Sequence, residues 1–66
     1  MLSARNQFKG QVKSVTLGNV VAEVIISVGS FEIVSVISRT SAEQMQLKVG
    51  DEVTAVIKST EVLIDK

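Results

Sequence analysis

The chain has 66 residues, enough for one domain, and its lack of cysteine and histidine excludes disulfides and disfavours a structural zinc site. Seven basic residues balance seven acidic ones, which argues against the basic face that nucleic-acid phosphates require. The sequence contains no run of about 18 apolar residues and no secretory signal, so we expect a cytoplasmic protein without a membrane partner.

The first predicted strand lies in FKGQVKSV, where apolar and polar residues alternate. The apolar positions then change parity to Val15 and Leu17, which predicts a bulge or a strong bend near Ser14. Gly18-Asn19 follows and predicts a two-residue hairpin turn that needs positive φ.

The next two predicted strands are apolar on both faces. The run NVVAEVIISV is β-branched almost throughout, and the run FEIVSVIS alternates without a clearly polar side. Gly29-Ser30 lies between them and predicts a type II′ turn. Because a sheet in an isolated small domain usually keeps one polar face, the pattern predicts a closed barrel with other subunits packed outside it.

A short helix is expected next, from about Ser41 to Leu47. Thr40 and Glu43 have the spacing of a capping box, and the residues that follow Ser41 favour a helix.

Two more strands are expected after this helix. Gly50-Asp51 predicts a turn into a fourth strand, EVTAVIK, and a fifth strand, TEVLI, is expected after Lys58-Ser59. This order of elements predicts an all-β fold, an OB-like five-stranded barrel with one short helix between strands 3 and 4.

The size and composition of the chain predict association. A domain this small buries only about 60% of the surface that its unfolded chain exposes. Small domains otherwise gain stability from disulfides or a bound metal, and the composition disfavours both. Because 45% of the residues are hydrophobic, we expect an obligate oligomer whose excess apolar surface is buried between subunits.

The composition does not favour catalysis. No His or Cys is present as a base or nucleophile, and neither GxSxG nor SxxK occurs. The seven carboxylates are scattered over predicted strands and turns and offer no paired acid and base, and no Gly-rich phosphate loop is present. The sequence therefore predicts a protein that is not an enzyme.

Hydrogen-bond donors lie at the ends of several predicted elements, with no carboxylate among them. If they converge, they suit a small tetrahedral oxyanion held by charge-assisted hydrogen bonds. The alternative interpretation is a helix cap at Ser41 and solvated surface charges at Arg5 and Lys58. The candidate residues are Ser3, Arg5, Ser38, Ser41, Lys58 and Ser59.

The motifs SARNQFKGQV, VISRTSAEQMQL and LKVGDEVTAVIKSTEVLI resemble the molbindin (Mop) family of small molybdate- and tungstate-binding proteins. The resemblance runs from Ser3 to Ile64 and implies a single Mop domain over residues 1–66. It further implies an OB-like barrel that assembles as a hexamer, a trimer of dimers, with oxyanions bound between subunits. The implied role is intracellular storage, buffering and homeostasis of molybdate or tungstate, without a cofactor.

The resemblance also implies a role for each site residue. Arg5 and Lys58 would supply the cations, Ala4 only its backbone, and Ser38 and Ser41 would come from a neighbouring subunit. The metal would be bound as the whole oxyanion and not as a bare cation. Asn6 and Gln7 belong to the first motif and are given structural roles. The implied oxyanion-binding set is Ser3, Ala4, Arg5, Ser38, Ser41, Lys58 and Ser59.

Two other interpretations stay open. A small β-barrel that binds nucleic acid would normally need stacking aromatics and a basic face, and only Phe8 and Phe31 are aromatic here. A purely structural oligomerisation domain would bind no small ligand.

Overall fold

The structure is a computed structural model that describes residues 4–66 of the chain. Its elements are β1 (Asn6–Leu17), β2 (Val21–Val28), β3 (Phe31–Ser38), α1 (Arg39–Gln44), β4 (Glu52–Ile57) and the 3₁₀ turn η1 (Ser59–Glu61). The four strands form one antiparallel sheet in the order β3-β2-β1-β4. None of the helices in the described residues is long and apolar enough to span a membrane. The expected mainly β fold with one short helix between strands 3 and 4 is confirmed.

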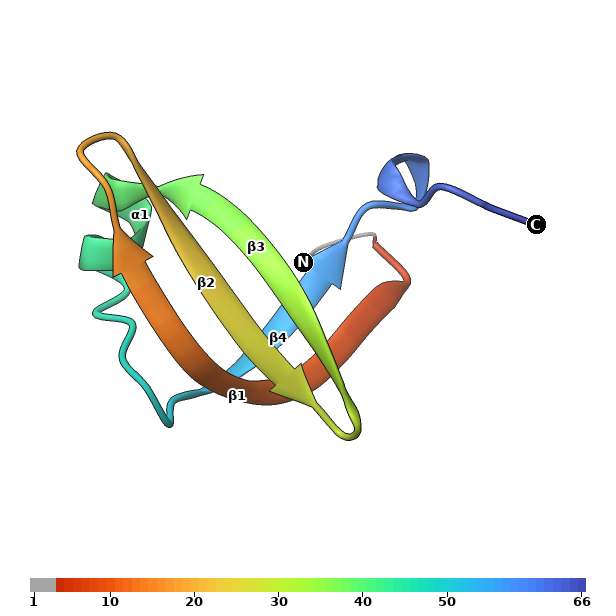
Figure 1. The fold of residues 1–66 in the computed structure, drawn as a ribbon, viewed down its shortest axis with the longest axis horizontal. Helices are drawn as coiled ribbons and strands as arrows, with labels where there is room; N and C mark the ends of the chain where they lie inside the picture. The colour runs from red at the N-terminus through yellow and green to blue at the C-terminus, as the bar shows by residue number, and fades with distance from the viewer. Residues whose placement is uncertain (1–3) are drawn as a thin grey trace.

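β1 is strongly curved and joins the two halves of the sheet (Figure 1). Its first half pairs with β4 and its second half pairs with β2. The register shifts between Val12 and Ser14, so the bulge predicted near Ser14 is confirmed. At Gly10 a Cβ would lie 2.3 Å from the backbone oxygen of Ser27, which shows how closely β1 and β2 approach. Only glycine fits there without a shift of the backbone.

The two hairpin turns differ in how well the sequence predicts them. Gly29 has φ +55° and stands between the paired residues Val28 and Phe31, as the predicted tight turn requires. The first turn is closed by a hydrogen bond of 2.8 Å from the N–H of Gly18 to the carbonyl of Val21. Its central residues are therefore Asn19 and Val20, one residue later than predicted. Neither Gly18 nor Asn19 has a positive φ, so that part of the prediction is wrong.

α1 begins and ends earlier than predicted. Its N-cap is Ser38, whose Oγ accepts a hydrogen bond from the N–H of Ser41 over 3.0 Å. Thr40 therefore lies within the first turn, and the predicted capping box from Thr40 to Glu43 is wrong. A hydroxyl at Ser38 satisfies the free N–H groups two residues earlier than the sequence suggested.

The C-terminus of α1 is a Schellman motif with an unusual residue. The N–H of Leu47 donates to the carbonyl of Ala42 and the N–H of Gln46 to that of Glu43, over 3.2 and 3.0 Å. Gln46 takes the left-handed position of this motif, with φ +53°. Glycine usually occupies that position, because a Cβ is disfavoured there.

The predicted fifth strand does not form. The first part of TEVLI lies in η1, and residues 62–66 belong to no strand and project from the fold (Figure 1). β3 and β4 are the two edges of the sheet and do not pair with each other, so the predicted closed five-stranded barrel is open in the described chain. The segment has the composition of a strand, but in the described chain it pairs with neither open edge, β3 or β4.

The core is small and lies on the inner face of the sheet. Val12, Val24, Ile26 and Ala55 form it, and partly buried side chains such as Phe8 pack around them. The outer face is also apolar in part, as predicted: Val34 is 59% exposed and Val36 is 64% exposed.

Candidate functional site

The pairing of β1 with β4 places two cations that are far apart in sequence at the same end of the sheet. The last pair of this ladder is Asn6 with Ile57, and Arg5 and Lys58 are the next residues outward on the two segments. Both are exposed. The ion pairs in the described chain join Lys13 to Glu32 and Arg39 to Glu43, and neither includes Arg5 or Lys58. The sheet therefore ends in two positive charges that no carboxylate neutralises within the described residues.

Backbone donors lie beside these cations. Ser59 opens η1, and the hydrogen bonds of this turn run from Glu61 N–H to Lys58 O and from Val62 N–H to Ser59 O. The N–H of Ser59 makes no backbone hydrogen bond within the described chain, as expected at the start of a helical turn. Lys58 and Ser59 thus offer a cation, an amide and a hydroxyl at one place.

The chain bends immediately before β1. Arg5 lies at this bend. Ser3 itself lies outside the described residues. The side-chain Nε2 of Gln7 donates to the backbone oxygen of Ala4 over 2.7 Å and spans the bend.

The two serines of the candidate set lie together at the start of α1. The Oγ of Ser38 donates to the Oγ of Ser41 over 2.8 Å. The capping role that the sequence left open is therefore filled, by Ser38 and not by Ser41.

Arg39, which the sequence analysis did not select, fixes the position of this serine pair. Its backbone N–H donates to the carbonyl of Val20 over 2.8 Å, and its Nη1 to that of Gly18 over 3.2 Å. These bonds tie the start of α1 to the turn between β1 and β2. The sequence could have indicated Arg39, because this cation directly follows Ser38, a candidate residue at the end of the third predicted strand.

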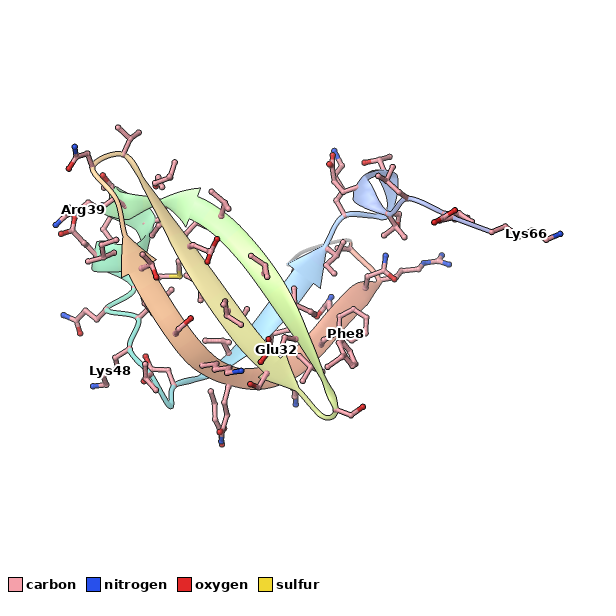
Figure 2. The ribbon with its side chains drawn as sticks, viewed as in Figure 1. Phe8, Glu32, Arg39, Lys48 and Lys66 are labelled. Carbon is pink, nitrogen blue, oxygen red and sulfur yellow. The ribbon has the colours of Figure 1, made fainter. Side chains whose placement is uncertain are left out.

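The serine pair and the cation pair lie at opposite ends of the sheet. Ser38 pairs with Val21, beside the far end of β1, whereas Lys58 lies beside its beginning. Figures 1 and 2 show the same separation, with α1 and Arg39 on one side and the end of β4 on the other. One chain therefore has Arg5, Lys58 and Ser59 at one end of the sheet and the serine pair at the other.

A groove between the two sheet edges was also missed, because the sequence predicted a closed barrel. It runs between β3 and β4 and is lined largely by apolar side chains, with Lys58 and Glu61 at one part. No group of three or more side chains suited to hold a metal cation occurs in the described residues.

Comparisons with known proteins agree with this fold. The family model of the TOBE domain matches residues 2–64. Molybdenum-pterin-binding protein 3 of Clostridium pasteurianum is 50% identical over 64 residues, which cover 96% of this chain and 94% of that protein. The structure of MopII from Clostridium pasteurianum matches with a TM-score of 0.93 at 46% identity and covers 100% of both chains. The cytoplasmic molybdate-binding protein ModG, with molybdate bound, matches with a TM-score of 0.85 at 44% identity, over 88% of this chain and 42% of that one.

The fold and these matches define a small OB-like module of the TOBE class. The chain belongs to the TOBE domain family and, within it, to the molbindin (Mop) family. The resemblance drawn from the sequence motifs is confirmed.

Proposed function

We propose that this protein binds molybdate or tungstate oxyanions between subunits and serves in their storage, buffering and homeostasis. The observation that supports the proposal is the register of β1 with β4, whose last pair, Asn6 with Ile57, is followed outward by Arg5 and Lys58, with no carboxylate paired to either in the described chain. The names of the relatives support the ligand, since one is a molybdenum-pterin-binding protein and ModG is a molybdate-binding protein. The chain acts as one Mop domain over residues 1–66, in the cytoplasm, without a cofactor and without catalysing a reaction.

The donor set suits a tetrahedral dianion. Molybdate carries two negative charges near neutral pH, and Arg5 and Lys58 balance them one for one. Hydroxyl and amide donors then hold its oxygens by charge-assisted hydrogen bonds. Protonated phosphate carries a hydrogen that needs an acceptor, so a pocket without a carboxylate, in which only serine hydroxyls can accept, disfavours it, whereas sulfate is excluded only by pocket size. The proposed set is Ser3, Ala4, Arg5, Lys58 and Ser59 of one subunit with Ser38 and Ser41 of a neighbour.

The division of the site between the two ends of the sheet supports an assembly. A serine pair at one end can meet a cation pair at the other only if they belong to different chains. The open edges of β3 and β4, and the groove between them, leave room for an added strand. Leu63 and Ile64, each 92% exposed, have the composition to fill it from a second copy. We propose a homo-oligomer, a hexamer built as a trimer of dimers.

The test is a calorimetric titration of the oxyanion-free protein with molybdate, tungstate, sulfate and phosphate in parallel. We expect tight binding of molybdate and tungstate, and weak or no binding of sulfate and phosphate. An intact oligomer that binds none of the four would contradict the proposal and favour a structural oligomerisation domain.

A further inference from the structure

Gln7 makes a hydrogen bond that reaches back across the bend before β1. Its Nε2 lies 2.7 Å from the backbone oxygen of Ala4, three residues earlier, and Arg5 lies at the bend between them. Gln7 pairs with Val56, and its neighbour Asn6 pairs with Ile57. The donor therefore lies on the first residues of β1 that the pairing with β4 holds in place.

The segment in front of β1 receives little other support. Beyond Asn6 the ladder between β1 and β4 has ended, and Ala4 and Arg5 belong to no strand. In the described part of the chain, no backbone hydrogen bond outside the regular elements includes Ala4 or Arg5. A chain end without such bonds is usually poorly ordered. The carboxamide of Gln7 is therefore the contact that fixes the backbone on which Arg5 stands.

This bond also occupies the acceptor of the residue next to Arg5 in the chain. The carbonyl oxygen of Ala4 carries partial negative charge and would repel an oxyanion if it turned toward the site. Gln7 donates to that oxygen and holds it in one direction. The effect is preorganisation: Arg5 is already placed, and the ligand does not have to order the segment on binding.

The other glutamine on the same face of β1 behaves differently. Gln7 and Gln11 are four residues apart, and the alternation of a strand places both side chains on one exposed face. Gln11 makes no side-chain hydrogen bond within the described chain. A glutamine on this face of β1 therefore does not need a hydrogen-bond partner within the chain. The hydrogen bond of Gln7 is a feature of the bend and not of the strand.

From these observations we propose that Gln7 is a positioning residue of the oxyanion site, acting through the Ala4 carbonyl and not through contact with the ligand. The inference rests on the function proposed above. It adds a determinant of affinity on the outer face of β1, behind the residues that bind.

The test compares three full-length proteins, the unchanged chain, Gln7→Met and Gln11→Met, titrated with molybdate. Methionine keeps the length of the side chain and removes the donor. We expect Gln7→Met to weaken the affinity by about three- to tenfold, the effect of losing one hydrogen bond that holds a binding conformation. Gln11→Met is expected to bind like the unchanged chain.

A second measurement separates positioning from folding. NMR relaxation of the Arg5 amide should report greater mobility on the ps–ns timescale in Gln7→Met, while the amides of β1 stay rigid. The oligomer mass and the midpoint of thermal unfolding without ligand should not change, because the lost bond lies outside the sheet.

The outcomes are distinguishable. If the unchanged chain binds molybdate and Gln7→Met binds it equally well, Gln7 has no positioning role. If Gln7→Met loses affinity only because its oligomer mass or thermal midpoint falls, its role is structural and the inference is also wrong. If the unchanged chain does not bind molybdate, the proposed function itself fails.

Discussion

At the scale of single residues, the feature that matters most is a pair of cations without counter-charges. Lys13 and Arg39 are each paired with a glutamate, whereas Arg5 and Lys58, which follow the last pair of the β1–β4 ladder, have no such partner in the described chain. Two like charges placed side by side repel each other unless an anion lies between them. Such a pair favours an anion site over a general role in stability.

We expect the double substitution Arg5→Ala and Lys58→Ala to lower molybdate affinity by about 100-fold or more, since each removes a charge-assisted hydrogen bond. The oligomer should persist. Titration calorimetry measures the first and light scattering the second.

Lys9→Ala with Lys48→Ala is the matched control, because it removes the same charge from exposed positions outside the site. Equal losses in both double variants would mean that net charge alone attracts the anion. Dissociation of the Arg5 and Lys58 variant would instead assign these residues to assembly.

At the scale of elements, α1 shows how a short helix is held at both ends. Ser38 caps its N-terminus, and the Schellman motif closes its C-terminus at the cost of a left-handed Gln46. The helix has only six residues, so its own hydrogen bonds cannot stabilise it without these ends and the burial of Ala42. The serine pair depends on α1 for its position.

The substitution Gln46→Gly should stabilise the protein by about 1 kcal/mol, because glycine adopts the left-handed conformation without the penalty of a Cβ. Gln44→Gly, two residues earlier and in the last turn of α1, is the control and should destabilise by about 0.5–1 kcal/mol. Thermal or denaturant unfolding checks both. A loss of stability in Gln46→Gly would show that the Gln46 side chain contributes more than its backbone costs.

At the scale of the whole molecule, the chain has more apolar surface than its own core can bury. Leu63 and Ile64 are almost fully exposed, and the groove between β3 and β4 is lined by apolar side chains. In the proposed homo-oligomer, the segment with Leu63 and Ile64 of one copy fills the groove of another copy.

The double substitution Leu63→Ser and Ile64→Ser should therefore lower the mass of the assembly, measured by size-exclusion chromatography with light scattering. The loss of apolar burial, about 2 kcal/mol or more for each side chain, removes the driving force for docking. Asp65→Ser with Lys66→Ser changes the next two residues and should leave the mass unchanged. An unchanged mass in the Leu63 and Ile64 variant would rule out this segment as the link between subunits.

The amino-acid sequence by itself determined what depends on neighbouring residues. Alternation predicted the first strand, the parity change near Ser14 predicted the bulge, and Gly29 predicted the second hairpin, because each is decided by the local conformations that those residues allow. The motifs also indicated the family, which the comparisons confirm.

Only the tertiary structure decided what depends on pairing between distant segments. TEVLI has the composition of a strand but forms none in the described chain, where it pairs with neither of the two open edges, β3 and β4. The start of α1 was settled by which hydroxyl reaches the free N–H groups, and that hydroxyl belongs to Ser38. Arg5 and Lys58 lie at the same end of the sheet because of the register of β1 with β4, and the serine pair lies at the other end because β1 is long and joins the two ends. Register is a property of two strands together, and therefore no pattern within one segment could reveal it.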